Sequence, residues 1–239
     1  MASRPPDPAA RQPARRRGGS RGSTALRATG EVLLTLGVVL LLFVVYLLWW
    51  TGVETGAAQS RLAGDLGRAV ATAPGPTKVT GGDGSSRGID SPPPVAATGA
   101  PYLDLTIPRL GDDWRWVVVQ GVGLTQLALG PGHYPGTAGP GEIGNFAVAG
   151  HRSGHGEPFA HLDRMKPGDL VRFSFGSRAW TYRVDKSFLT DPSDVGVIDP
   201  VPGQPGATPT RRLLTLTTCD PRWGNERRLI VVATLVKGR

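Results

Sequence analysis

The single cysteine of this 239-residue chain, Cys219, is the first residue whose type could carry chemistry. It ends the apolar run LLTLTTC, and a second apolar run follows the pair Arg227 and Arg228. A lone thiol is commonly an inert, buried side chain. A thiol with cations nearby, placed where a strand leaves its sheet, can instead form the reactive thiolate. This stretch by itself fits both a structural cysteine and a nucleophile.

His151 is the residue best placed to move a proton, because it follows the apolar segment NFAVAG at the end of an expected strand. His155 and His161 fit ordinary surface histidines. The segment HRSGHGEPFAH also spaces three histidines in the manner of metal ligands. However, Gly154 and Gly156 disfavour the helix that an HExxH-type zinc site needs, and the acidic residue of that motif is missing. We therefore expect no metal site.

Cysteine, histidine and arginine at three strand ends form a set suited to acyl transfer. The thiolate of Cys219 would attack a carbonyl carbon, His151 would handle the proton of the leaving amine, and an arginine would stabilise the oxyanion or position the substrate. Neighbouring residues of a strand point to opposite faces of the sheet. Only one of Arg227 and Arg228 can therefore face the cysteine.

The elements that carry these residues belong to an all-β domain over residues 101–239. Short runs rich in Val, Ile, Leu, Phe, Trp and Thr alternate with Gly, Pro and Asp turns, which is typical of a β-sandwich or β-barrel. The runs are YLDLTIP, WRWVVVQG, GNFAVAG, DLVRFSFG, AWTYRVDKSFL, RRLLTLTTC and RRLIVVATLV. Only TQLALGPGHY and EPFAHLDRM favour short helical turns, and a single cysteine excludes an intrachain disulfide.

The first hundred residues divide into three segments. Residues 1–31 hold seven arginines and two acidic residues, with little to bury, and we expect this basic cytoplasmic tail to be disordered. Residues 32–50 are nineteen residues without a charge; as a helix they would span roughly 28 Å, close to a bilayer core of about 30 Å. Residues 51–100 would form a flexible extracytoplasmic linker, with a short helical piece around residues 57–71.

The basic tail sets the expected topology. Because the arginines precede the apolar segment, the N-terminus should be cytoplasmic and everything after Trp50 should lie outside the plasma membrane. A cleaved signal peptide is the alternative, but its apolar core is usually shorter, about 7–15 residues. The net charge of +8 lies mainly in this tail and not across a folded face. We therefore expect a single-pass membrane protein that binds no nucleic acid.

Two segments of the β domain resemble the sortases, the cysteine transpeptidases of Gram-positive bacteria. TLTTC, followed nine residues later by an arginine, resembles the TLxTC…R signature of that family, and NFAVAGHR resembles its histidine segment. The histidine precedes the cysteine by 68 residues, and this order and spacing also agree. The resemblance covers residues 101–239 and implies a sortase-like β-barrel with short helical turns.

The resemblance also implies roles for individual residues. Cys219 would be the nucleophile and His151 the general acid/base, while Arg228, favoured over its neighbour by alignment of the following VAT, would bind substrate or the oxyanion. Thr218 would form a wall of the site. The stretch from GPGHYPG to MKPGD resembles in particular the class E sortases of actinobacteria, in which the residue matching Tyr134 is associated with an LAXTG signal in place of LPXTG.

The implied reaction is cleavage between Thr and Gly of an LAXTG- or LPXTG-type signal on an exported protein. A thioacyl-enzyme would form and be resolved by a peptidoglycan amine, with no cofactor and no metal. A pilin-polymerising sortase is one alternative, although residues 51–100 show no clear lid motif. An L,D-transpeptidase is another, but Ser153-Gly154-His155-Gly156 lacks the cysteine of an SHGC-type motif. A non-enzymatic, membrane-tethered β-domain would need no reactive thiol.

Overall fold

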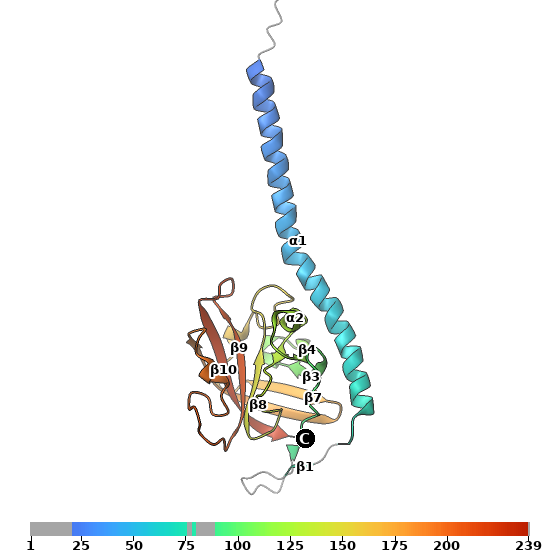
Figure 1. Cartoon of the computed structure of the whole chain (residues 1–239), viewed down its shortest axis with the longest axis vertical. Coiled ribbons are helices and arrows are strands. Elements are labelled where there is room, and N and C mark those ends of the chain that lie inside the picture. The colour runs from blue at the N-terminus through green and yellow to red at the C-terminus, as the bar shows by residue number, and fades with distance from the viewer. Residues whose placement is uncertain (1–20, 76–77, 80–88, 239) are drawn as a thin grey trace, which may run out of the picture. The chain divides into compact units, whose positions relative to one another are not determined.

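The computed structural model describes residues 21–75, 78–79 and 89–238 (Figure 1). Most of the predicted basic tail and the Gly/Ser-rich part of the predicted linker, residues 1–20, 76–77 and 80–88, lie outside the described residues. The helices and 3-10 turns are α1 (Arg21–Thr72), η1 (Pro108–Leu110), α2 (Leu124–Leu127), η2 (Leu162–Arg164) and η3 (Val195–Ile198). The strands are β1 (Lys78–Val79), β2 (Ile89–Asp90), β3 (Pro101–Thr106), β4 (Arg115–Gln120), β5 (Gly132–His133), β6 (Gly144–Ala149), β7 (Leu170–Phe175), β8 (Arg178–Thr190), β9 (Arg212–Asp220) and β10 (Arg227–Gly238).

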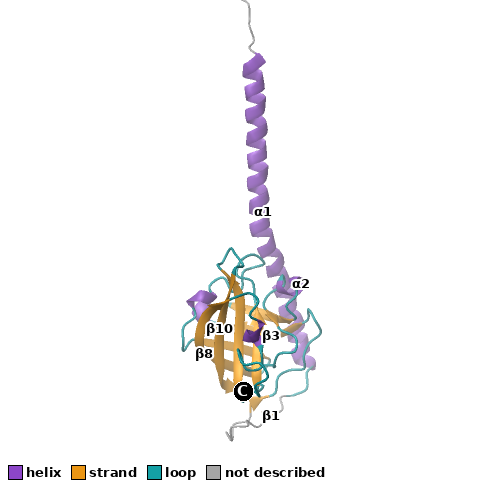
Figure 2. Ribbon diagram, turned by 60° about the vertical axis from the view of Figure 1, so that its left-hand side comes forward, coloured by secondary structure: helices purple, strands orange, loops and turns teal. Residues whose placement is uncertain are grey.

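Eight strands, β3 to β10, close into a barrel in the order β10-β8-β7-β3-β4-β5-β6-β9, and β9 completes the ring by pairing with β10. Figure 2 shows these strands in orange with their connecting loops in teal. Most neighbours are antiparallel, but β4 runs parallel to β5, and β6 runs parallel to β9. The prediction of an all-β barrel with short helical turns is confirmed.

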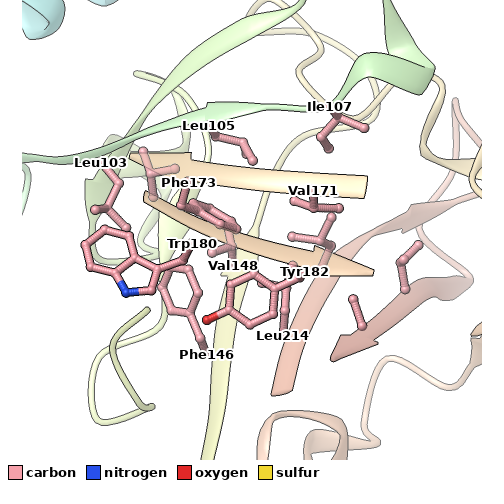
Figure 3. Close-up of a cluster of buried hydrophobic side chains, with 14 of the residues drawn as sticks. Leu103, Leu105, Ile107, Phe146, Val148, Val171, Phe173, Trp180, Tyr182 and Leu214 are labelled. Atoms are coloured by element: carbon pink, nitrogen blue, oxygen red, sulfur yellow. The ribbon is translucent and has the colours of Figure 1, made fainter. Parts of the chain in front are cut away.

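The barrel interior is filled by alternate residues of its strands, as the two-residue period of a strand requires. Along β7 the buried positions are Val171, Phe173 and Phe175. Large rings meet at the centre, where Phe146 packs edge-on against Phe173 with ring centroids 4.8 Å apart. Figure 3 shows this cluster, which also includes Leu103, Leu105, Ile107, Val148, Trp180, Tyr182 and Leu214. The residues left on the outer face of each strand are those available to a site.

The N-terminal part of α1 contains one segment long and apolar enough to cross a bilayer, Thr24–Tyr46, with a mean hydropathy of 2.4. Its described apolar side chains from Val32 to Tyr46 are exposed. Its length and composition are those of a segment that could cross a membrane. The segment overlaps the predicted membrane span over residues 32–50.

The C-terminal part of α1 corrects the expectation that residues 51–100 form a flexible linker. The helix continues to Thr72, and Leu62 and Leu66 are 7% and 3% exposed within the same hydrophobic cluster as the barrel core. Ala69 and Val70 pack against that cluster as well. These residues recur at helical spacing, so one face of the helix is apolar and is buried against the barrel.

Gln59 fixes this helix to the edge of β4. β5 is only two residues long and pairs with β4 at Val119 and Gln120. Earlier in β4, beyond the reach of β5, the side-chain amide of Gln59 accepts a hydrogen bond from the Val117 backbone N–H (2.7 Å) and donates to the Val117 carbonyl (3.1 Å). The amide thus takes the place of a strand residue and satisfies backbone groups that would otherwise be left at an open sheet edge.

Described residues within the predicted linker, before and after its Gly/Ser-rich part, are also fastened to the barrel. The buried guanidinium of Arg178 donates to the backbone carbonyls of Pro74 (2.8 Å), Ser91 (3.3 Å) and Pro92 (3.4 Å). One side chain therefore holds the chain on both sides of residues 76–90.

Candidate active site

Three neighbouring strands bring His151, Cys219 and Arg228 to one level of the barrel. β6 and β9 run parallel and pair Ala149 with Thr217. His151 and Cys219 each follow two residues later along the chain. On the other side of β9, Arg228 of β10 is paired directly with Cys219. His151 in the loop after β6, Cys219 on β9 and Arg228 on β10 therefore lie at one level, and we name them the catalytic row after the roles that the sequence predicts for them.

The strand register separates the two candidate arginines. Directly paired residues of antiparallel strands point to the same face, so Arg228 shares the face of Cys219, whereas Arg227 is paired with Asp220 and points to the other face. The Arg228 guanidinium donates to the backbone carbonyls of Asn225 and Arg227, both at 3.2 Å. The structure thus places Arg228, and not Arg227, beside the cysteine.

Cys219 lies on the outer face of the barrel near the end of β9. The residues at even positions of the strand, Leu214 and Leu216, belong to the core, so odd positions point outward. The cysteine itself is half-buried. A thiol in this position is accessible to a substrate, unlike a fully buried structural cysteine.

His151 is half-buried in the loop after β6, and its ring stacks on that of His155, with centroids 5.0 Å apart and planes 29° apart. Burial lowers the pKa of His151, and the neighbouring charge of His155 lowers it further. Both causes disfavour the imidazolium. His155 is therefore not the ordinary surface histidine that its sequence context suggested.

Arg152 connects the loop that carries His151 to the strand that carries Cys219. Its side chain is 8% exposed and forms ion pairs with Asp220 and, at 3.3 Å, with Asp163. It also donates to the backbone carbonyl of Cys219 at 3.5 Å. A buried cation needs such partners. Through them Arg152 joins its own loop to Cys219 and Asp220, which lie 67 and 68 residues later in the sequence.

Thr218, the predicted wall of the site, lies in the barrel and not in the cleft. It is 3% exposed, and its hydroxyl donates to the Gly150 carbonyl at 2.7 Å. Its neighbour Thr217 points to the face of Cys219 and shares a hydrogen bond of 3.1 Å with the Tyr134 hydroxyl. Strand alternation forces this result, and the same rule applied to the sequence would have identified Thr217.

A cavity of about 620 Å³ lies along the same outer face as the catalytic row, beneath the segment between β8 and β9. Its lining includes Leu213 and Val232, which share the outward faces of Cys219 and Arg228, together with Phe188, Val197 and Val201. Val232 is four residues from Arg228, a distance of about 13 Å along a strand. The cavity is thus separate from the reacting groups but on the same side of the sheet.

The described residues contain no group of three or more His, Cys, Asp or Glu side chains that could hold a metal ion.

Comparison with known proteins agrees with this geometry. The sequence profile of the sortase domain matches residues 105–236. The chain is 35% identical over 237 residues to sortase SrtE1 of Streptomyces coelicolor, covering 96% of this chain and 62% of that protein. It therefore spans somewhat less than two thirds of the length of that relative.

Solved structures give the same result. Sortase E from Streptomyces avermitilis matches with a TM-score of 0.55 and 43% identity, over 60% of this chain and 93% of that one. The crystal structure of sortase E1 from Streptomyces coelicolor, which holds a tripeptide in its active site, matches with a TM-score of 0.54 and 36% identity, over 60% of this chain and 93% of that one. The chain belongs to the sortase family of cysteine transpeptidases and is similar to its class E members.

Proposed function

We propose that the protein is a membrane-anchored transpeptidase that cleaves an LAXTG- or LPXTG-type signal between Thr and Gly and transfers the exported protein to a peptidoglycan amine. The observation that carries this proposal is the catalytic row. Cys219 and Arg228 are paired on β9 and β10, and His151 follows the end of β6, the strand on the other side of β9, which supports a nucleophile, a cation and a proton-transfer group in one site.

The three groups of the row suffice for acyl transfer. The thiolate of Cys219 attacks the Thr carbonyl carbon and forms a C–S bond, and the resulting oxyanion is stabilised by the Arg228 guanidinium. The C–N bond to Gly then breaks, and the leaving nitrogen takes the proton of the His151 imidazolium. A thioacyl-enzyme and a neutral imidazole remain.

The second half of the reaction reverses these proton movements. The acceptor amine attacks the thioester carbon and gives its proton to His151. The C–S bond breaks, and the thiolate and the imidazolium are restored. The lowered pKa of His151 makes its imidazolium a stronger acid toward the leaving amine than an ordinary imidazolium and favours its neutral form near neutral pH.

Tyr134 and Thr217 are proposed to contact the signal peptide. They lie on the face of Cys219 and share a hydrogen bond, so that their hydroxyls are held in place before a peptide binds. The tripeptide in the active site of sortase E1 supports a peptide ligand for this cleft, and the resemblance to class E supports LAXTG as the preferred signal.

The segment Thr24–Tyr46 is proposed to anchor the enzyme, with its arginine-rich N-terminal side in the cytoplasm and the barrel outside the plasma membrane. This topology would bring the catalytic row to the side of the membrane where exported proteins and cell-wall precursors meet.

Mass spectrometry of the enzyme incubated with LAXTG and LPXTG peptides tests the reaction. We expect an acyl adduct on Cys219 that ends at the Thr of the peptide and disappears when an amine is added. The variant Cys219→Ala should form no adduct and should release no peptide fragment that begins with the Gly of the signal. Turnover by this variant would overturn the assignment of the nucleophile.

A further inference from the structure

Residues 154–157, in the loop after β6, form a left-handed turn. Four consecutive residues have positive φ: Gly154 (69°), His155 (49°), Gly156 (71°) and Glu157 (51°). Glycine adopts this conformation freely, but histidine and glutamate do so rarely. His155 and Glu157 are the non-glycine residues with positive φ in the described part of the chain. Such a conformation persists only where its surroundings hold it.

The turn is held at both of its ends. The Glu157 N–H donates to the Gly154 carbonyl (2.9 Å), and the Gly154 N–H donates to the Glu157 carboxylate (3.2 Å). The same carboxylate forms an ion pair with Arg222, which lies in the loop after Cys219. The turn is therefore tied to the loop that follows the nucleophile.

Close packing leaves little room for the turn to move. A Cβ atom on Gly156 would lie 2.7 Å from the Trp116 ring and 3.2 Å from the Thr55 side chain. Only glycine fits there, both for its positive φ and for this approach. The backbone on the C-terminal side of His155 is thus pressed against β4 and α1.

This arrangement presents the ring of His155 to His151. The two rings stack with centroids 5.0 Å apart, and both residues are half-buried. We propose that the left-handed turn holds His155 as a positioning residue, whose ring restrains the imidazole of His151 in the orientation needed for proton transfer. This inference rests on the proposed function, because it assigns a role toward the histidine of the catalytic row.

The physical reason for the restraint is rotational freedom. An imidazole turns about two side-chain torsions, and a ring in face contact with it reduces the orientations that it can adopt. Proton transfer in acyl chemistry requires the donor nitrogen to be within hydrogen-bond reach of the reacting atom. A preformed orientation therefore increases the rate of the chemical step and changes substrate binding little.

The electrostatic effect of the same contact agrees with this role. Burial and the charge of His155 both lower the pKa of His151. Other charged or titratable groups on the surrounding elements include Cys219 and Asp220 of β9, Arg227 and Arg228 of β10, Asp163 and Arg164 of η2 and, in the loops, Arg152, Glu157 and Arg222. They are the same in every variant at residue 155, so a change in the His151 titration reports on the loss of the His155 side chain.

Two substitutions separate the ring from its charge. His155→Asn removes the ring but keeps a residue that tolerates positive φ, and His155→Phe keeps an aromatic ring without a titratable nitrogen. His161→Asn is the matched control. His161 lies in the same connection between β6 and β7, and its ring stacks on no other aromatic ring among the described residues. All variants are made in the full chain, and thermal unfolding verifies that they are folded.

The readouts are the NMR titration of His151 and the steady-state kinetics of peptide cleavage. The His151 pKa should rise slightly in His155→Phe, which removes the electrostatic influence of the second imidazole, and further in His155→Asn, which also exposes the His151 ring to water. We expect kcat to fall about tenfold in His155→Asn with KM nearly unchanged. His155→Phe should retain most of the wild-type kcat, and His161→Asn should change neither quantity.

The proposal is wrong if His155→Asn leaves both the titration and kcat as in the wild type, or if His155→Phe loses as much kcat as His155→Asn. The titration does not depend on turnover. Suppose that the His151 pKa rises in His155→Phe and rises further in His155→Asn, but that the wild-type protein cleaves no sorting-signal peptide. This result would support the contact between the two histidines and count against the proposed function.

Discussion

β9 and the loop over residues 150–157 each deliver one residue to the catalytic row, but they position it in different ways. β9 is paired with β6 over residues 212–217 and with β10 over residues 213–220, so the ladder with β10 fixes the backbone of Cys219. His151 lies beyond the end of β6, where side chains take over: Arg152 through its ion pairs, His155 through its ring and Glu157 through Arg222.

The difference concerns what a substitution can disturb. The hydrogen bonds of a ladder join backbone atoms, so a change of one side chain in β9 or β10 should act mainly on the chemistry or the contacts of the residue that is changed. A loop held by side chains moves when one of those side chains is lost. Substitutions around His151 should therefore change the rate of reaction from a distance.

Replacing Arg228 tests the residues that the β9–β10 ladder positions, and it should give the largest effect. Arg228→Ala should lower kcat by about 10²–10³, the scale of one oxyanion donor, while Arg227→Ala, as a surface substitution, should change it by about twofold at most. Steady-state cleavage of a sorting-signal peptide measures both. The reverse ranking would mean that the arginine reaches the cleft from the other face of β10.

Replacing Asp220 tests the side-chain contacts that hold the loop over residues 150–157. Asp220→Asn removes the carboxylate that ties the buried Arg152 to the strand of Cys219, and we expect kcat to fall about tenfold because His151 is no longer held against β9. Asp163→Asn is the matched control, since Asp163 pairs with the same guanidinium but is more exposed, 53% against 21%. Equal losses of kcat in the two variants would show that Arg152 serves the fold alone.

The two threonines before Cys219 sharpen the contrast within β9 itself. Thr217→Val removes the partner of the Tyr134 hydroxyl and should raise KM by about threefold, the effect of one neutral hydrogen bond. Thr218→Val leaves the Gly150 carbonyl without its donor and should cost about 1–2 kcal/mol of stability with little change in KM. Peptide kinetics and thermal unfolding, measured on both variants, separate these outcomes.

Much of the barrel, and of the part of the site carried by β9 and β10, could be predicted from the sequence. Short apolar runs between Gly, Pro and Asp turns indicated the strands, and alternation limited the arginine to one of two neighbours. The register then placed Arg228 opposite Cys219. Alternation also predicts that Thr218 faces away from Cys219. Its assignment to the wall of the site therefore failed through a rule that the sequence already supplied.

The loop side could not be predicted in the same way. Gly154 and Gly156 disfavoured a helix in this loop, but nothing local required the positive φ of His155 and Glu157. The partners that hold the loop are distant in the sequence, such as Glu157 and Arg222, which are 65 residues apart. A single sequence shows residue types and local periods, whereas these contacts depend on the closed barrel.

The contact of α1 with β4 has a consequence for where the catalytic unit can be cut. Removing residues 55–72 would strip Gln59 from the Val117 backbone and uncover the apolar surface beneath Leu62 and Leu66. An unpaired strand edge next to an exposed apolar patch favours association with other chains. A recombinant fragment that starts at Pro101 should therefore aggregate more readily than one that starts shortly before Thr55 and keeps its own helix as a cover.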